Sequence, residues 1–197
     1  MDRLTVSALR AKAGDRRALD ELIAELQPDV WRLCRFLGSP ADPDDLTQET
    51  FERALRSLHR FRGDGAVRSW MLSIARRVCV DSTRRLIRRR HLDERLGQHF
   101  SDANHRDASW LEVDDLLAGL DRERREAFVL TQLVGLSYEE AADAIGCPIG
   151  TIRSRVARAR TQLLGIDVIA AARSALETGN QPGIVNDSLI ETSLVEV

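Results

Sequence analysis

Hydrophobic residues recur at steps of three and four along most of the first 164 positions of the chain. This spacing gives each segment one apolar stripe, as an amphipathic helix requires, and no segment alternates polar and apolar residues as a half-buried strand does. The pattern predicts an all-helical protein. Helices are expected over residues 14–37, 43–58, 69–90, 110–120 and 121–134, and then over two shorter segments that begin at Tyr138 and Pro148.

Prolines and acidic residues mark several of the expected helix ends. Pro28 lies inside the first apolar pattern, and because proline disrupts a helix interior, we expect it to open a second helix over residues 29–37. Asp42 is a suitable N-cap for the next helix, with Pro43 at its first position. The stretch FRGDGA, residues 61–66, is expected to be a loop.

The apolar pattern is lost between residues 91 and 109, where Asp, Asn, His, Ser and Gly accumulate. Such a composition is typical of a linker, and a short surface helix at LDERL is the alternative. We therefore expect two small helical domains, over residues 1–90 and 110–165, joined by a flexible linker over 91–109. A tail over residues 166–197 is apolar and acidic, and the sequence assigns it no role.

Composition narrows the functional classes. The chain has 197 residues, of which 43% are hydrophobic and 30% charged, as is typical of a foldable soluble protein. Cys34, Cys79 and Cys147 are far apart and the four histidines are scattered, so neither a disulfide framework nor a metal site is expected. No catalytic motif is present, which predicts a protein that is not an enzyme and has no catalytic residues and no cofactor. Without an apolar run long enough for a signal peptide or a membrane span, we expect a cytoplasmic location and no membrane insertion.

Positive charge is concentrated in two short segments. The net charge is −2, but residues 165–197 carry −4, which leaves +2 for the rest of the chain. Residues 147–160, CPIGTIRSRVARAR, contain four arginines and no acid, and residues 84–91, RRLIRRRH, form a second basic cluster. Two basic segments predict two contacts with a polyanion such as DNA; the alternative is a pair of solvated helix faces.

The stretch GLSYEEAADAIGCPIGTIRSRVARARTQLLG, residues 135–165, has the features of a helix-turn-helix. Ser137 and Glu140 are spaced as a capping box, and Gly146 is placed to turn the chain. One face of the second helix is apolar, and the opposite face is expected to enter a DNA groove. The expected DNA-contacting residues are Thr151, Arg153, Ser154, Ala157 and Arg158, with Arg155 and Arg160 toward the flanks, where they suit phosphate contacts.

These segments together resemble the extracytoplasmic-function (ECF) sigma factors of bacterial RNA polymerase. LSYEEAADAIGCPIGTIRSRVARAR resembles their region 4, which reads the minus-35 promoter element, and DPDDLTQETFERAL with FRGDGAVRSWMLSIARRVCVDSTRR resembles their region 2. The resemblance implies no enzymatic activity, and a function in promoter recognition, DNA opening and transcription initiation on core polymerase. It also implies contacts with the β′ clamp helices and the β flap of core polymerase, with promoter DNA, and with an anti-sigma factor.

The resemblance assigns roles to residues of region 2. Core polymerase is expected to bind the helix face of Asp45, Gln48, Glu49 and Glu52, which without the resemblance reads as a solvated face. The minus-ten element is expected to contact Phe61, Arg62, Gly63 and Asp64 of the loop and Arg76, Arg77, Arg84 and Arg85 of the next helix. Arg77 replaces an asparagine that is frequent in the family, which leaves the minus-ten preference open. Trp70 is expected in the core rather than as a stacking platform.

A conventional helix-turn-helix regulator that binds operator DNA as a dimer is the alternative function. The order of the two motifs along the chain argues against it, and binding to core polymerase would separate the two functions. The net charge of −2 further predicts that the free chain binds promoter DNA weakly, because phosphate contacts supply most non-specific affinity.

Overall fold

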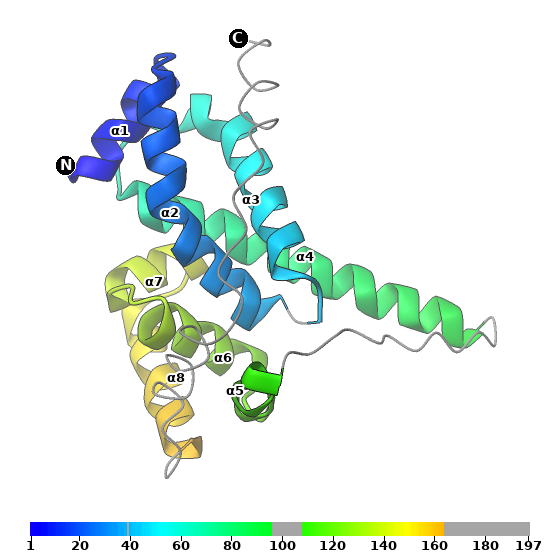
Figure 1. Cartoon of the computed structure of the whole chain (residues 1–197). Helices are drawn as coiled ribbons and strands as arrows, with labels where there is room; N and C mark the ends of the chain where they lie inside the picture. The colour runs from blue at the N-terminus through cyan, green and yellow to red at the C-terminus, as the bar shows by residue number, and fades with distance from the viewer. Residues whose placement is uncertain (39, 96–107, 164–197) are drawn as a thin grey trace.

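The computed structural model describes residues 1–38, 40–95 and 108–163, with the side chains of residues 90–112 outside the description. Every regular element among these residues is helical, as the sequence predicts. The helices form an N-terminal unit, α1 to α4, and a C-terminal unit, α5 to α8, which lie against each other (Figure 1). The two basic segments predicted from the sequence therefore lie in different units, residues 84–91 in α4 and residues 147–160 at α8.

The N-terminal unit is built around α2 (Arg16–Leu37), which packs on α1 (Arg3–Lys12), α3 (Pro43–Ser57) and α4 (Val67–Arg95). A short 3-10 turn, η1 (Leu58–Arg60), follows α3. The predicted start of α3 is confirmed, because the Asp42 carboxylate accepts a hydrogen bond from the Asp44 backbone N–H at 2.8 Å and Pro43 is the first helical residue. The far half of α4 extends beyond the other helices (Figure 1).

The C-terminal unit consists of four short helices. These are α5 (Ala108–Ala118), α6 (Arg122–Phe128), α7 (Tyr138–Ile145) and α8 (Ile149–Gln162). A π-helical turn, η2 (Val129–Leu133), continues α6, so the helix expected over residues 121–134 changes its hydrogen-bond pattern halfway. α8 packs on both α6 and α7.

The expected break at Pro28 is wrong. α2 is one helix of 22 residues with Pro28 inside it. Buried residues lie on both sides of the proline, Ile23 and Leu26 before it and Val30 and Leu33 after it, and all belong to one core. Burial of this continuous apolar stripe outweighs the loss of one backbone hydrogen bond, which is how tertiary packing overrides a local preference.

The expected linker is partly helical. α4 continues through Arg95, so the first residues of the segment 91–109 extend the helix, in line with the alternative of a helix at LDERL. α5 begins at Ala108, two residues before the predicted start. Residues 96–107 and the tail over 166–197 lie outside the described residues.

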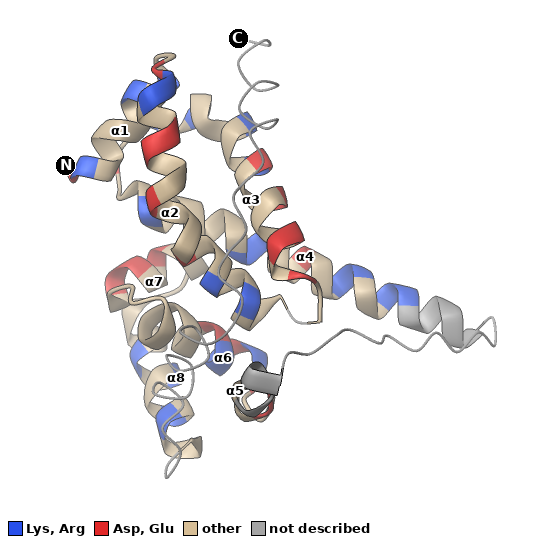
Figure 2. Cartoon of the chain, viewed as in Figure 1, with Lys and Arg blue, Asp and Glu red and all other residues tan. Residues whose placement is uncertain are grey.

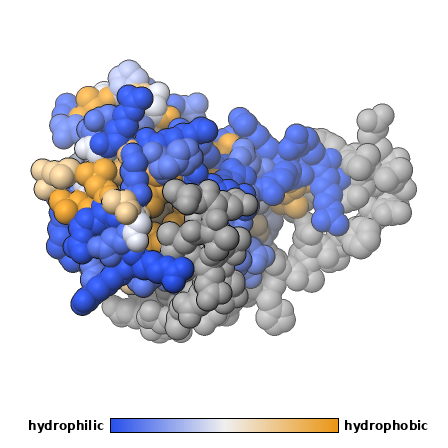
Figure 3. All heavy atoms as spheres, turned by 90° about the horizontal axis from the view of Figure 1, so that it is seen from above, coloured by the Kyte–Doolittle hydropathy of each residue, from blue (hydrophilic) through white to orange (hydrophobic). Residues whose placement is uncertain are grey.

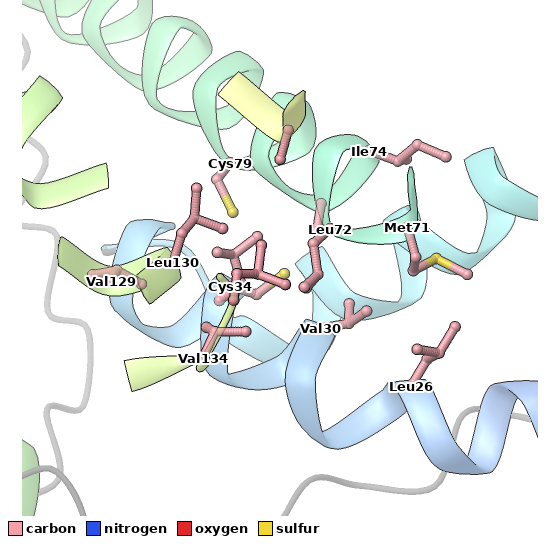
Figure 4. Packing of buried hydrophobic residues seen from close by; sticks show 14 of the residues in the cluster. Leu26, Val30, Cys34, Met71, Leu72, Ile74, Cys79, Val129, Leu130 and Val134 are labelled. Atoms are coloured by element: carbon pink, nitrogen blue, oxygen red, sulfur yellow. The ribbon is translucent and has the colours of Figure 1, made fainter. Parts of the chain in front are cut away.

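The two units share one hydrophobic core. Leu130 and Val134 of the C-terminal unit lie in the same buried cluster as Cys34 of α2 and Leu72 of α4. Figure 4 shows these side chains directed toward one another between the helices. Seen from above, hydrophobic residues appear only in small areas of the described surface (Figure 3). The buried cluster, which contains residues of both units, therefore holds the units together.

Two of the three cysteines lie inside this core. Cys34 and Cys79 are buried thiols, as expected, and Cys147 is partly exposed; none of the three is in a disulfide. A hydrogen bond with Cys34, together with burial, raises the pKa of the Cys79 thiol well above its ordinary value. A protonated buried thiol is a poor nucleophile, so these cysteines act as small core residues.

Replacing Pro28 by alanine should stabilise the chain. Pro28 is exposed in the middle of α2, where proline cannot donate a backbone hydrogen bond and alanine can. We expect Pro28→Ala to raise the free energy of unfolding by about 1–2 kcal/mol, measured by urea denaturation, after allowing for the greater freedom of the unfolded chain. Asp20→Ala, at another exposed position of α2, is the control with a smaller effect. Equal or lower stability of Pro28→Ala would contradict this account.

Candidate nucleic-acid interface

Local sequence signals set the position of the recognition helix α8. The Ser137 hydroxyl accepts from the Glu140 backbone N–H at 3.1 Å, and the Glu140 carboxylate accepts from the Ser137 N–H at 2.8 Å, which completes the predicted capping box. Gly146 ends α7 with φ of +79°, a left-handed conformation that favours glycine. Pro148 is the N-cap of α8 rather than its first residue. The helix-turn-helix is therefore confirmed as a structure.

One face of α8 is buried and the other is open. Ile152, Val156 and Ala159 pack into the core. Arg153 and Arg158 are exposed, and neither has an ion pair or a hydrogen bond from its side chain among the described residues. Ser154 and Ala157 are exposed between them, and Thr151 is half-buried at the start of the helix.

The flanking arginines of α8 are already bound within the C-terminal unit. Arg155 is paired with Glu123 of α6, and its side chain is only 19% exposed. Arg160 donates to the amide oxygen of Gln132 at 2.6 Å. These two side chains are thus held in place, whereas Arg153 and Arg158 remain available.

The expected minus-ten loop lines a cavity of about 410 Å³ between the two units. Phe61 is buried against Trp70, with ring centroids 5.1 Å apart, while Arg62 and Asp64 are exposed. Gly63 has φ of +78°, and a Cβ there would lie 3.3 Å from a Leu9 methyl, so glycine suits this position. Phe61 is thereby part of the core, and Trp70, expected in the core, is half-buried and also lines the cavity.

Acidic residues of α7 lie on the opposite wall of the same cavity. Glu140 and Asp143 line it together with the loop, and the hydroxyl of Ser69 at the start of α4 lies 3.5 Å from a Glu140 carboxylate oxygen. In this arrangement the C-terminal unit closes one side of the loop expected to take a DNA base.

The arginines of α4 lie in three different environments. Arg76 donates to Glu126 of α6 through Nε at 3.1 Å and Nη2 at 2.8 Å. Arg77 and Arg84 are exposed. Arg85 donates to both carboxylate oxygens of Glu49 at 3.1 Å. Figure 2 shows the basic residues continuing along the projecting half of α4.

The expected polymerase-binding face lies on α3, on the N-terminal unit. Asp45 and Gln48 are exposed, and Glu52 is half-buried with a weak 3.5 Å contact to Gln48. Glu49 faces outward less than expected: its side chain is 29% exposed, and Arg53 and Arg85 both pair with it. Arg53 also pairs with Asp81 of α4 at 2.9 Å, an ion pair that lowers the pKa of Asp81.

Sequence reasoning missed the polar contacts between the units. Arg35 of α2 donates to both oxygens of Asp114 at 3.0 Å, with side chains only 12% and 9% exposed. Arg125 donates to the Phe36 carbonyl at 3.0 and 2.6 Å. Arg68 donates to Asp29 at 2.7 Å and to the Val134 carbonyl at 2.6 Å.

One sequence signal could have pointed to this boundary. Asp114 is spaced three residues from both Leu111 and Leu117, and Glu126 is spaced four residues from Leu130. Each carboxylate thus falls on the apolar stripe of its helix, and buried carboxylates need cationic partners. Within the described parts of the chain, no group of histidine, cysteine and acidic side chains is arranged to hold a metal ion. No described helix has the length and apolar character that a membrane span requires.

Two family models match the chain. Sigma-70 region 2 matches residues 22–90, and Sigma-70 region 4 matches residues 110–163. The first match covers α2 to most of α4, and the second covers most of α5 to α8. The alternative function, a conventional operator-binding regulator, does not explain why the N-terminal half matches Sigma-70 region 2.

Curated relatives match over most of their own length. The ECF RNA polymerase sigma factor SigC of Mycobacterium tuberculosis is 44% identical over 165 residues, covering 82% of this chain and 89% of the relative. The ECF RNA polymerase sigma-E factor of Haemophilus influenzae is 34% identical, covering 82% and 95%.

Solved structures share the fold. CnrH in complex with the cytosolic domain of CnrY has a TM-score of 0.67 at 31% identity, covering 82% of this chain and 95% of that one. The sigma factor RpoE from Bartonella quintana, in complex with the anti-sigma factor NepR, has a TM-score of 0.63 at 28% identity, covering 76% and 98%. This chain therefore belongs to the ECF sigma factors of bacterial RNA polymerase, proteins that are not enzymes but bind core polymerase and direct transcription initiation.

Proposed function

We propose that this sigma factor reads the minus-35 element with α8 and the minus-ten element with the loop 61–64 and α4. It acts in the cytoplasm, docks on the β′ clamp helices through α3, and contacts the β flap through its C-terminal domain. The observation that carries the proposal is the open arginine face of α8 opposite a fully buried one. Such a helix can enter a major groove without losing its packing.

Arg153 and Arg158 are the proposed base-reading residues of α8. Each is exposed without a partner among the described residues, so binding DNA breaks no internal contact. Arg155 and Arg160 are already oriented by Glu123 and Gln132, which suits them to hold phosphates at the groove edge.

Alanine at Arg153 or Arg158 should reduce discrimination between correct and altered minus-35 sequences by about 1–3 kcal/mol each. Arg160→Ala is the control, expected to weaken binding equally across sequences and to lower the salt slope by roughly one. The measurement is competition binding of holoenzyme to matched and altered promoter fragments at several salt concentrations. Unchanged discrimination in both alanine variants would refute the base-reading role.

The α3 face supports docking on core polymerase because it remains accessible while the two domains are together. Asp45 and Gln48 are exposed, and no ion pair occupies Asp45 among the described residues. Core polymerase can therefore engage the chain before the domains separate, and binding energy from that contact can then be used to open it.

Reversing charge on this face should prevent association with core polymerase. We expect Asp45→Lys with Gln48→Lys to abolish holoenzyme formation on a sizing column while circular dichroism shows unchanged helicity. This pair avoids Glu49, whose ion pairs with Arg53 and Arg85 stabilise the domain itself. Asp20→Lys with Glu21→Lys, on the exposed side of α2, is the matched control. Normal assembly of the α3 variant would refute the assignment.

The closed arrangement supports weak DNA binding by the free protein. Arg76, a proposed minus-ten contact, is bound to Glu126, and the minus-ten loop faces the acidic side chains of α7. DNA must displace these carboxylates before it can contact Arg76 or the minus-ten loop. We propose that core polymerase separates the domains and so exposes the minus-ten surface, whereas the arginine face of α8 is already open.

Neutralising the buried carboxylates should release this inhibition. In the double variant Asp114→Asn with Glu126→Gln, Arg35 and Arg76 lose their charged partners, and the domain boundary loses buried ion pairs. We expect free protein to bind a promoter fragment about tenfold or more tightly and its radius of gyration to increase. Asp115→Asn with Glu139→Gln, which neutralises two exposed carboxylates of the same domain, is the control with the same change in net charge. Identical affinity and size in the double variant would contradict the proposal.

An anti-sigma factor is the proposed inhibitor of this chain in the cell. CnrH and RpoE of Bartonella quintana were each solved with a second protein, and NepR is described as an anti-sigma factor. Their similarity to this chain across both domains supports an equivalent partner. Such a partner would inhibit either by covering the α3 face, so that core polymerase cannot bind it, or by stabilising the closed arrangement.

A further inference from the structure

A second, smaller crevice lies between the two domains, apart from the minus-ten loop. It has a volume of about 220 Å³ and is lined from α4 by Arg76 and Cys79 and from α6 by Arg122, Arg125 and Glu126. This volume is several times the roughly 30 Å³ that one water occupies and below the about 300–1,000 Å³ of sites that enclose drug-sized ligands. The crevice suits a small polar ligand.

The charges around the crevice are unbalanced. Its described lining contains three arginines and a single carboxylate, that of Glu126. Both oxygens of Glu126 are in use: one accepts from Arg76, and the other accepts from Arg122 at 3.2 Å. Glu126 therefore orients two guanidinium groups without neutralising the site.

Arg125 is the crevice arginine without a direct ion pair among the described residues, since the nearby carboxylate of Asp114 is bound by Arg35. It donates through Nε and Nη2 to the Phe36 carbonyl, and among the described residues no carboxylate lies within ion-pair distance and no acceptor faces its Nη1. Burial lowers the pKa of the Arg125 guanidinium; the nearby Asp114 carboxylate opposes this effect and the charge of Arg35 adds to it. A largely buried charge of this kind is stabilised by a bound anion.

We propose that this crevice binds a small multivalent oxyanion, either inorganic phosphate or the phosphoryl group of a small metabolite, held between Arg76, Arg122 and Arg125. Guanidinium groups bind such oxygens with paired, charge-assisted hydrogen bonds. Because Arg76 comes from one domain and Arg122 and Arg125 come from the other, the ligand bridges the domains and stabilises the closed arrangement. The anion site requires the closed arrangement, in which the two domains are in contact, and it does not depend on which residues contact promoter DNA.

The binding test uses the full chain in phosphate-free buffer without DNA. Inorganic phosphate, pyrophosphate and glycerol 3-phosphate are titrated separately and followed by ³¹P line broadening and by the thermal melting midpoint, with sodium chloride at matched ionic strength as the blank. We expect saturable binding of at least one anion and a rising melting midpoint. Strongest binding of inorganic phosphate identifies a free anion as the ligand, and strongest binding of glycerol 3-phosphate identifies a metabolite phosphoryl group.

Two variants and a control decide whether the crevice is the site. Arg122→Gln and Arg125→Gln should each raise the apparent dissociation constant at least about tenfold. Arg122 is 55% exposed, so its variant keeps the test valid if Arg125→Gln does not fold. Arg124→Gln changes a neighbouring arginine that pairs with Asp121 and Gln162 outside the crevice, and it should bind normally. Absence of saturation for every anion, or equal weakening by Arg124→Gln, would overturn the proposal, and neither result bears on promoter recognition.

Discussion

Two buried carboxylates constrain how the domains of this sigma factor fit together. Asp114 and Glu126 are less than one tenth exposed, and a buried charge is tolerated only when it is paired. Their partners, Arg35 and Arg76, come from the other domain, so each ion pair exists only in the closed arrangement. The shared apolar core around Leu130 supplies burial energy, while the ion pairs select one arrangement among those the apolar surface would allow.

The same constraint links stability to function. Breaking a buried ion pair by removing one partner costs about 3–5 kcal/mol, but here DNA phosphates could replace Glu126 as the partner of Arg76. Opening the domains would therefore exchange an internal carboxylate for an external phosphate as the partner of Arg76, rather than leave its charge unpaired. In the proposed mechanism this exchange keeps Arg76 of the minus-ten surface from binding nucleic acid until the domains open.

Local features were predictable from the sequence and long-range ones were not. The capping box at Ser137 and the N-cap at Asp42 involve residues within a few positions of each other, and both are present as expected. The expected helix break at Pro28 was wrong because the energetic penalty of a proline inside α2 is outweighed by the packing of α2 on other helices. That packing involves residues distant in the sequence, so the residues around Pro28 do not reveal it. Arg35 and Asp114 are 79 positions apart, so no periodicity could pair them. DNA binding by the helix-turn-helix was predicted from its own pattern and arginines, whereas the roles in minus-ten and polymerase binding came from the family resemblance, which composition alone could not supply.

The two-domain architecture accounts for the proposed division of promoter recognition between two surfaces that each bind DNA weakly. We propose that neither basic surface binds DNA tightly alone, and in the closed form the C-terminal domain covers one side of the proposed minus-ten loop, residues 61–64. When core polymerase fixes both domains at a set separation, the second contact becomes intramolecular, and its effective concentration replaces missing affinity. In this proposal the closed contacts need only be strong enough to keep the minus-ten surface covered until core polymerase binds. Stronger contacts between the domains would further weaken DNA binding by the free protein. They would also raise the free energy of separating the domains, which binding to core polymerase must supply.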